Sequence, residues 1–452
     1  MTLNVHFVGI GGIHMSALAH ILLDDGLVVS GCDRADSPIL QPLRDRGARI
    51  MIGHNEHHVT TATHVVRTAA VPEAHPEIAR TIELGIPLQT RAELLSEIAA
   101  PRDVITVGGT HGKTTTTAMI AHAMRASGRD AGYVIGGEVP GFCVHARRGN
   151  DPWLVLEADE YGRAFHHYAP QVAVLTNCEP DHLDYYGSQA ALEEAFLRYV
   201  GTVKQQGTLI AGVDSPLAVE IASKLEVQRP DVQIVTCSSR VPADYRIRSN
   251  GEEFELATPS SEISGRLRQP GEYQQQNAAV ALAALDVAGF DGPAAAEALA
   301  TFNGVNRRFQ LHGETNDVLV LDDYAHHPTE VSAAIAAARQ RWPNRRFVVL
   351  FQPHTYTRTS YLLDGFRSCF AAADIVYTVD TYAARAMSGE EMTAEQLAGE
   401  IVAPKASYAG SVERSAALAA DQAQAGDLII TMGAGDIDAA GPIILSRLGA
   451  DS

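Results

Sequence analysis

The residues best suited to chemistry lie in a glycine-rich stretch, GGTHGKTTTT, over residues 108–117. It follows the apolar run DVITV and precedes a helical pattern, a setting in which backbone N–H groups and a helix N-terminus bind phosphate. Lys113 is expected to reach the β- and γ-phosphates of ATP, and the Thr114 hydroxyl to ligate Mg²⁺. Val107 occupies the position of the usual first glycine, so the loop is a short variant. The other expected nucleotide-binding residues of the loop are Gly109, Thr110, Gly112 and Thr115.

Two further segments place ionisable side chains where predicted strands end. Glu157 lies in LEADEY, which closes the strand WLVLEAD, and His182 lies in TNCEPDHLDYY, which follows VAVLTN. The carboxyl ends of parallel strands face the crevice in which α/β sheets bind ligands. Hard oxygen donors there suit Mg²⁺. Acidic residues in the turns, such as Glu160 and Asp184, could instead be solvated or cap a helix without binding an ion.

The elements that must position these residues alternate between short apolar runs and Ala/Leu-rich helical stretches. This alternation predicts an α/β architecture of parallel sheets with crossover helices. Strand–glycine turn–helix units recur near residues 5, 104 and 347, which indicates three successive domains. We place them at residues 1–100, 101–308 and 309–452. Residues 240–270 are expected to form a local antiparallel excursion before a helix.

Composition narrows the class of protein. The chain has 452 residues, of which 46% are hydrophobic, enough for several packed domains. The formal net charge of −19 argues against nucleic acid as a partner. No apolar run approaches the ~20 residues of a membrane span, and no signal peptide is apparent. Five scattered cysteines fit a reducing compartment. We expect a cytoplasmic monomer or homodimer that does not bind membranes.

Seven motifs occur together in one order: GTHGKTTTT, EADEY, TNCEPDHLDYY, FNGVNRRFQLHG, DDYAHHPTE, FQPHTYTRT and TMGAGDI. This ordered set resembles the Mur ligase family over essentially the whole chain. The resemblance implies a Rossmann-like N-terminal domain that binds a UDP-sugar, a central P-loop ATPase domain with a parallel sheet, and a Rossmann-like C-terminal domain that binds an amino acid. Members of the family use ATP to convert a carboxylate into an acyl phosphate, which an amine then attacks.

The resemblance also implies roles for individual residues. Lys113 would stabilise the transferred phosphoryl group, Thr114 and Glu157 would bind one Mg²⁺, and His182 would bind a second. The nucleotide would further contact Asn277, Arg308 and Asp323. Tyr324, His326, His354 and Arg358 would surround the incoming amino acid, with Arg358 on its carboxylate. The expected catalytic residues are Lys113, His182, Arg308, His326 and Arg358.

The N-terminal stretch HFVGIGGIHMSALAHIL resembles the UDP site of the family. The expected substrate-binding residues there are Gly11, Gly12, Ile13, His14 and Asp33. Taken alone, the glycine motif leaves a nicotinamide cofactor as an open alternative. His14 stands where relatives usually have glycine, which crowds the approach of the pyrophosphate. Other departures are Tyr273 and Gln274, in place of a usual His-Asn pair, and Thr355, where several relatives carry arginine.

The helix ALEEAFLRYVG lacks the lysine of the family members that add later residues. Its absence favours the member that joins the first amino acid, L-alanine, to UDP-N-acetylmuramate. Two alternatives within the family stay open: a recycling ligase that adds a whole tripeptide, and a related amide ligase with another amino acid. A nucleotide-dependent binding module without ligase chemistry is disfavoured by Glu157, His182 and Arg308.

Overall fold

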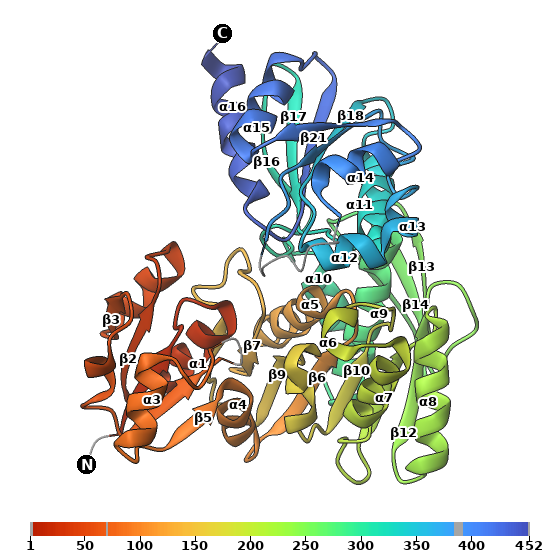
Figure 1. Ribbon diagram of the computed structural model, residues 1–452. Coiled ribbons are helices and arrows are strands. Elements are labelled where there is room, and N and C mark those ends of the chain that lie inside the picture. Colours follow the sequence, from red (N-terminus) through yellow and green to blue (C-terminus); the bar gives the residue numbers. More distant parts are fainter. Residues whose placement is uncertain (1–2, 69–70, 384–391, 451–452) are drawn as a thin grey trace.

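The computed structural model describes residues 3–68, 71–383 and 392–450, which form three sheets that follow one another along the chain. Figure 1 shows the N-terminal sheet on one side, the middle sheet beneath, and the C-terminal sheet above it. The predicted α/β fold of three successive domains is confirmed. No helix among the described residues is both long and apolar enough to cross a membrane.

The N-terminal domain is built on a parallel sheet of order β3-β2-β1-β4-β5. Its strands are β1 Asn4–Val8, β2 Val28–Asp33, β3 Arg49–Ile52, β4 His64–Arg67 and β5 Leu88–Thr90. Its helices are α1 Ile13–Asp24, α2 Gln41–Asp45, α3 Pro76–Glu83 and α4 Arg91–Ala99, with short 3₁₀ turns η1 Pro38–Leu40 and η2 Glu56–Val59. The order reverses beside β1, so the glycine turn after β1 lies at a topological switch point, where such sheets bind ligands.

The middle domain has a sheet of order β15-β14-β13-β12-β11-β10-β6-β9-β7-β8. Its strands are β6 Asp103–Gly108, β7 Gly132–Val134, β8 Ala146–Arg147, β9 Trp153–Glu157, β10 Val172–Leu175, β11 Thr208–Gly212, β12 Gln233–Ser238, β13 Tyr245–Asn250, β14 Glu253–Ala257 and β15 Glu262–Arg266. Its helices are α5 Lys113–Ala126, α6 Leu183–Tyr186, α7 Gln189–Val200, α8 Pro216–Gln228, α9 Glu272–Val287 and α10 Gly292–Leu299, with η3 Tyr161–His167. The antiparallel pairs β13–β14 and β14–β15 confirm the excursion predicted over residues 240–270.

The C-terminal domain has a sheet of order β16-β17-β21-β18-β19-β20, parallel except for β16. Its strands are β16 Gln310–Thr315, β17 Val318–Asp323, β18 Arg346–Phe351, β19 Ile375–Val379, β20 Ala406–Gly410 and β21 Asp427–Met432. Its helices are α11 Pro328–Arg341, α12 Tyr356–Tyr361, α13 Leu363–Phe366, α14 Ala394–Glu400, α15 Val412–Asp421 and α16 Ala440–Ala450, with η4 Ile437–Ala439.

The N-terminal and middle domains share an apolar core, whereas the C-terminal domain has cores of its own. One continuous core contains Leu18 of α1, Leu95 of α4 and Phe165 and Tyr199 of the middle domain. The C-terminal sheet instead has cores of its own on its two faces: Phe347, Val349 and Phe351 of β18 point into one, and Val348 and Leu350 into the other. Burial on both faces explains why this strand is a continuous apolar run.

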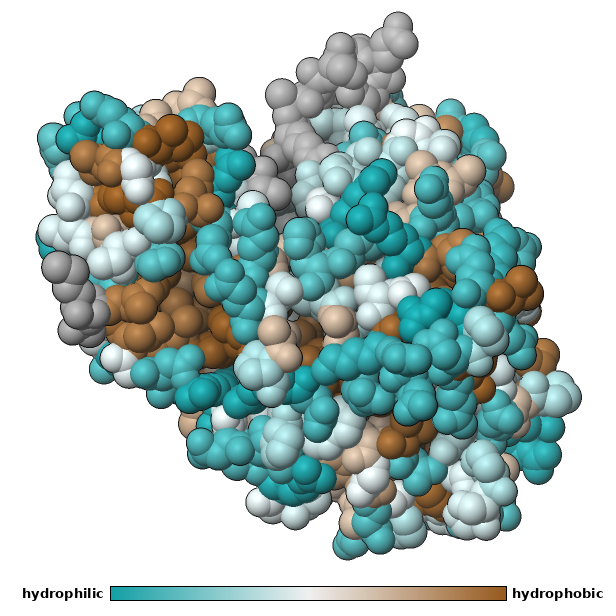
Figure 2. Space-filling model, turned by 90° about the horizontal axis from the view of Figure 1, so that it is seen from below, coloured by the Kyte–Doolittle hydropathy of each residue, from teal (hydrophilic) through white to brown (hydrophobic). Residues whose placement is uncertain are grey.

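Seen from below, apolar side chains gather over the N-terminal domain (Figure 2). Its exposed apolar residues include Val28 and Ile52, at strands β2 and β3, and Ile82 of α3. Such a surface offers an anionic substrate no charge and few hydrogen-bond donors.

Candidate active site

The loop between β6 and α5 has a backbone that glycine alone adopts without strain. Gly109 has φ of 137° and Gly112 has φ of 80°, and Gly112 caps the N-terminus of α5. A Cβ atom at Gly109 would overlap Thr176 Oγ1, and one at Gly112 would overlap Asn277 Oδ1. The strand, the turn and the helix predicted from the sequence are all present. The loop thus brings the start of α5 close to the end of β10 and to Asn277 in the second turn of α9.

Lys113 bends back over its own loop. Its Nζ donates to Gly109 O at 2.7 Å and Thr110 O at 2.9 Å, and lies 2.9 Å from the Glu160 carboxylate. Burial opposes the positive charge, but Glu160 and Glu157 outweigh it and raise the pKa of Lys113. The ammonium is therefore charged and held at the loop, where it can reach a phosphate by exchanging these partners.

Thr114 and Glu157 form the core of a possible Mg²⁺ site. Thr114 Oγ1 donates to Glu157 Oε1 at 3.1 Å, and Glu157 Oε2 accepts from Gly136 N at 2.8 Å. Both side chains are buried, and burial raises the pKa of Glu157 while Lys113 lowers it. A hydroxyl and a carboxylate side by side supply the hard oxygen donors that Mg²⁺ prefers, and the remaining positions would fall to water and phosphate. The residues present fit the ion.

His182 caps α6 and lies on the far side of Glu160. Its Nε2 is 3.4 Å from Glu160 Oε1 and 3.7 Å from Asp181 Oδ2. Burial lowers the pKa of His182, but the hydrogen bond to Glu160 and the charge of Asp181 give a net rise. Only a neutral imidazole binds metal, so a cation at His182 would compete with a proton for the ring nitrogen. Glu160 thus links Lys113 to His182.

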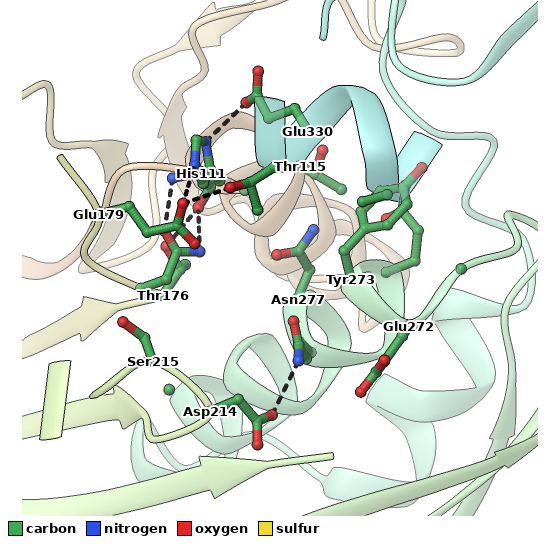
Figure 3. Close-up of a pocket in the computed structure, with 18 of the residues that line it drawn as sticks. His111, Thr115, Thr176, Glu179, Asp214, Ser215, Glu272, Tyr273, Asn277 and Glu330 are labelled. Atoms are coloured by element: carbon green, nitrogen blue, oxygen red, sulfur yellow. Dashed lines mark hydrogen bonds and ion pairs between the residues drawn. The ribbon is translucent and has the colours of Figure 1, made fainter. Parts of the chain in front are cut away.

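A cavity of about 740 Å³ opens between the middle and C-terminal domains, beside this loop. Figure 3 shows His111, Thr115 and Asn277 on the middle-domain side and Glu330 across from them. Among the predicted nucleotide-binding residues, the cavity is lined by Gly112, Thr114, Thr115, Asn277, Arg308 and Asp323. Gly109, Thr110 and Lys113 lie in the loop beside it, and Thr110 Oγ1 donates to Glu179 O at 3.1 Å.

The departures Tyr273 and Gln274 both line the cavity. The Tyr273 hydroxyl and Gln274 Oε1 are buried and have no hydrogen-bond partner among the residues that the structure describes. Buried polar atoms are nearly always paired, so orphans at a cavity wall indicate a ligand or water that completes them. A base with donor and acceptor edges fits this wall.

Among the cavity residues that the sequence analysis did not assign to the site are His111 and Glu330. His111 Nδ1 lies 3.1 Å from Glu330 Oε1, and His111 Nε2 lies 3.4 Å from Glu179 Oε2. Burial lowers the pKa of His111, but Glu330 and Glu179 together raise it to about 9. A positive imidazole at the nucleotide loop thus ties the middle domain to α11. Its position inside the glycine motif was the available signal.

Arg308 and Asp323 lie where the chain enters the C-terminal domain. Arg308 Nη1 is 3.7 Å from Glu330 Oε1, and its guanidinium stacks 4.8 Å from the Tyr324 ring. Asp323 accepts Phe309 N and Ala325 N, each at 2.8 Å. Burial raises the pKa of Asp323 to about 7, against the opposing charge of Arg308. Asp323 therefore holds the backbone around Arg308.

The residues expected to bind the amino acid lie close together, but Arg358 already forms an ion pair with Asp181. Its Nε donates to Asp181 Oδ1 at 2.9 Å, and its Nη1 lies 2.7 Å from His354 Nδ1. The guanidinium is 6% exposed, so Asp181 of the middle domain occupies it across the domain boundary. Its predicted contact with an amino-acid carboxylate stays a prediction.

His326 completes this cluster. Its ring lies 5.5 Å from that of Tyr324 and 5.7 Å from that of His354, measured between centroids. Its Nδ1 is 2.9 Å from Tyr324 O. Burial lowers the pKa of His326 to about 3, more than Glu330 can offset, so the imidazole is neutral. A neutral imidazole can accept a hydrogen bond from an ammonium group.

The predicted UDP residues lie apart from this cavity, in the N-terminal domain. Gly11 N donates to Asp33 Oδ2 at 2.8 Å, and Gly12 caps α1. Ile13 and His14 lie in the first turn of α1, and the buried His14 Nε2 has no hydrogen-bond partner in the described part of the chain. Burial, followed by the charge of Arg91, lowers the pKa of His14 to about 3. The imidazole is therefore neutral and faces the middle domain.

A glycine loop of this kind at the mouth of an interdomain cavity places the chain among the P-loop nucleotide-binding α/β proteins. Three family models match it in order: Mur ligase family, catalytic domain, over residues 4–102; Mur ligase middle domain over 107–285; and Mur ligase, glutamate ligase domain, over 307–435. The chain belongs to the Mur ligase family, which confirms the resemblance stated above.

Similar proteins extend over the whole chain. A UDP-N-acetylmuramate–L-alanine ligase of Roseiflexus castenholzii is 40% identical over 99% of this chain and 98% of its own. One of Thermobifida fusca is 38% identical over 99% and 97%. Among solved structures, a UDP-N-acetylmuramate–alanine ligase of Thermotoga maritima matches with a TM-score of 0.83 and 25% identity over 100% of both chains. A murein peptide ligase of Psychrobacter arcticus matches with a TM-score of 0.76 and 26% identity over 99% of both.

Proposed function

We propose that this protein uses ATP to join L-alanine to the carboxylate of UDP-N-acetylmuramate, a step of peptidoglycan precursor synthesis that yields ADP and phosphate. The observation that carries the proposal is the loop with Lys113, Thr114 and Glu157 at a cavity that the C-terminal domain completes. Full-length relatives that bear the name of this activity, at about 40% identity, support the choice of substrates.

The three domains divide the substrates in this proposal. Residues 1–100 bind the UDP-sugar at the glycine turn after β1, residues 101–308 bind ATP, and residues 309–452 bind the amino acid. The C-terminal residues His326, His354 and Arg358 lie next to Asp181 and His182, which supports their place beside the reacting carboxylate. That the enzyme works in the cytoplasm, as a monomer or homodimer, stays a prediction.

The chemistry proceeds in two steps. A carboxylate oxygen of UDP-N-acetylmuramate attacks the γ-phosphorus of ATP, and the bond to ADP breaks. The amine of alanine then attacks the acyl carbon, and phosphate leaves with the electron pair of the broken C–O bond. The amine loses a proton to solvent in forming the amide. Phosphorylation is required because a carboxylate is a poor electrophile.

The residues of this chain stabilise charge and orient the reactants in both steps. Lys113 would exchange Glu160 for the γ-phosphate, and Arg308 would contact the same nucleotide from the domain boundary. Mg²⁺ held by Thr114 and Glu157, with a second ion at His182, would neutralise phosphate and acyl oxygens. The neutral His326 would accept a hydrogen bond from the amino acid. The reacting atoms must approach to about 3–3.5 Å, which the interdomain cleft can impose.

A second candidate function is ligation of a preformed tripeptide to the same UDP-sugar. The structural likeness to the murein peptide ligase of Psychrobacter arcticus supports this second candidate. Both functions use the same ATPase residues, so only the amine substrate distinguishes them.

Phosphate release tests the proposal directly. The purified protein is assayed with ATP, Mg²⁺ and UDP-N-acetylmuramate, adding L-alanine, glycine, L-serine or the tripeptide in turn. We expect release that requires the UDP-sugar and is fastest with L-alanine. Release that requires the tripeptide, or that proceeds without UDP-N-acetylmuramate, would overturn the proposal.

A further inference from the structure

A cluster of metal-binding side chains lies inside the N-terminal domain, away from the glycine loop that we assign to ATP. His6 of β1, Cys32 of β2 and Glu77 of α3 are all fully buried, at 0% exposure. One ligand atom from each lies within 4.8 Å of the others. Three separate elements therefore direct an imidazole, a thiol and a carboxylate to a single point in the core.

The contacts centre on the Glu77 carboxylate. Cys32 Sγ is 2.7 Å and His6 Nε2 is 3.4 Å from Glu77 Oε2. On the other oxygen, His58 Nδ1 lies at 2.9 Å and His54 Nδ1 at 3.6 Å. His54 Nδ1 is also 3.3 Å from Cys32 Sγ. The imidazoles of His54 and His58 are therefore close enough to supply a further ligand.

The Glu77 carboxylate is buried among a thiol, a backbone N–H and imidazoles. Its two oxygens lie within hydrogen-bond distance of the Cys32 thiol, the Asn55 N–H and the imidazoles of His6 and His58. In the described part of the chain its partners are neutral donors or histidines, and no lysine or arginine pairs with it. A buried carboxylate is costly unless a positive charge compensates it.

The donor set fits zinc. Thiolate, imidazole and carboxylate are the ligands of Zn²⁺, at about 2.0–2.3 Å, which places tetrahedral ligand atoms roughly 3.3–3.7 Å apart. The separations of 3.4 Å between His6 and Glu77 and 3.3 Å between Cys32 and His54 fall in this range. The Cys32–Glu77 pair, now a hydrogen bond, would open by about 1 Å when the thiol proton leaves.

Neighbouring groups are arranged to orient the ligands. His6 Nδ1 lies 3.0 Å from Ser30 Oγ, so in the tautomer with its proton on Nδ1 the ring would donate to Ser30 and leave Nε2 able to bind a cation. The backbone oxygen of Cys32 accepts Gly9 N at 2.9 Å and Ile10 N at 3.0 Å, which belong to the glycine turn after β1. A metal at Cys32 would thus fix the turn that we assign to the UDP-sugar.

We propose that His6, Cys32 and Glu77 bind a zinc-class divalent cation as a structural site, with a nearby imidazole or water as the fourth ligand. Binding breaks the S–H bond of Cys32, and the proton passes to solvent. The site lies in a different domain from the proposed Mg²⁺ ligands, and its test does not depend on the ligase activity.

Spectroscopy with Co²⁺ tests the site, because a thiolate ligand gives cobalt an intense charge-transfer band. Metal-stripped full-length protein is titrated with Co²⁺ alone, and Zn²⁺ is then added. We expect the band to saturate at one equivalent of Co²⁺ and to vanish when Zn²⁺ displaces it. The other cluster of the described residues with metal-ligand spacing, His111, Glu179 and His327, has no cysteine and cannot give this band. Absence of a thiolate band at stoichiometric Co²⁺ would overturn the proposal.

Two matched variants locate the thiolate. Cys32→Ser should abolish the band and weaken Co²⁺ binding at least tenfold, whereas Cys143→Ser, at an exposed cysteine, should change neither. Stoichiometric Zn²⁺ should raise the Tm of the wild type and of the Cys143→Ser variant but not that of Cys32→Ser. If Cys32→Ser fails to fold, the wild-type band and its persistence in Cys143→Ser still support the site. A band that survives in folded Cys32→Ser would refute it.

Discussion

Two strand–glycine turn–helix units in this molecule share a backbone but differ in their side chains. The first joins β1 to α1 through a turn with Gly9 at φ 84°, and the second joins β6 to α5 with Gly112 at φ 80°. In the second, Lys113 and Thr114 begin the helix, with Glu157 at hydrogen-bond distance. In the first, those two helix positions hold Ile13 and His14.

The difference in side chains indicates that the first turn only binds a substrate, whereas the second turn also takes part in phosphoryl transfer. Both turns lead into a helix N-terminus, α1 or α5, where backbone N–H groups could hold a diphosphate. Transfer of a phosphoryl group also requires mobile positive charge and a metal site, and only the second turn has the lysine, the hydroxyl and the carboxylate for these. The first turn has a neutral His14 and the acceptor Asp33 instead, which suit recognition of a nucleoside. We expect substitutions at the two turns to affect different substrates.

The largest effect is expected from Lys113→Met, which removes the ammonium and keeps most of the apolar stem. Phosphate release should fall by about 10²–10³-fold, because a buried donor to developing charge is lost. Binding of UDP-N-acetylmuramate, measured by calorimetry, should not change. Lys224→Met on the exposed surface of α8 is the matched control. An equal loss of UDP-sugar binding in Lys113→Met would contradict the assignment of the two turns to different substrates.

Glu157→Gln should raise the Mg²⁺ concentration for half-maximal activity by about tenfold or more, since a neutral amide is a weaker ligand than a carboxylate. Its Tm should be unchanged or higher, because the variant no longer buries a charge at the end of β9. The Mg²⁺ dependence of phosphate release gives the measurement, with Glu226→Gln at an exposed position of α8 as the control. If Glu157→Gln keeps the Mg²⁺ dependence of the wild type, Glu157 does not bind the ion.

A smaller effect is expected at the first turn from Asp33→Asn. The amide oxygen can still accept the Gly11 N–H, but a charged acceptor becomes a neutral one, which is worth about 1 kcal/mol. KM for UDP-N-acetylmuramate should rise by several-fold, while KM for ATP stays constant. Steady-state kinetics in each substrate separates the two. A rise in KM for ATP alone would contradict the assignment of the turns.

The smallest effect is expected from His14→Gly, which introduces the glycine that the family resemblance predicts at this position. Removal of the imidazole should lower KM for UDP-N-acetylmuramate by a few-fold, because the pyrophosphate can then approach the helix more closely. The pKa of His14 is lowered to about 3, so its charge does not change near neutrality and the ratio of KM values should be the same at pH 6.5 and 8.5. His14→Ala separates the side chain from the added flexibility of glycine. An increase in KM for both variants would show that His14 binds the substrate.

Much of this arrangement could be predicted from the sequence because it depends on local pattern. The glycine turns, the alternation of strands and helices, and the antiparallel excursion at β13–β15 follow from residue types that act within a few positions. The pairing of Thr114 with Glu157 could also be anticipated, since β6, which precedes Thr114, and β9, which ends at Glu157, are parallel strands that end at the same edge of one sheet.

Contacts between distant segments could be decided only by the tertiary structure. His111 meets Glu330 across 219 residues of sequence, and Arg358 meets Asp181 across 177. The cluster at Cys32 and Glu77 likewise joins β2 to α3 within the N-terminal domain. Local periodicity tells which face of an element is buried but not which face of another domain it meets. The partners of these charges were therefore set by the packing of domains and elements, whereas the phosphate loop was determined by its own ten residues.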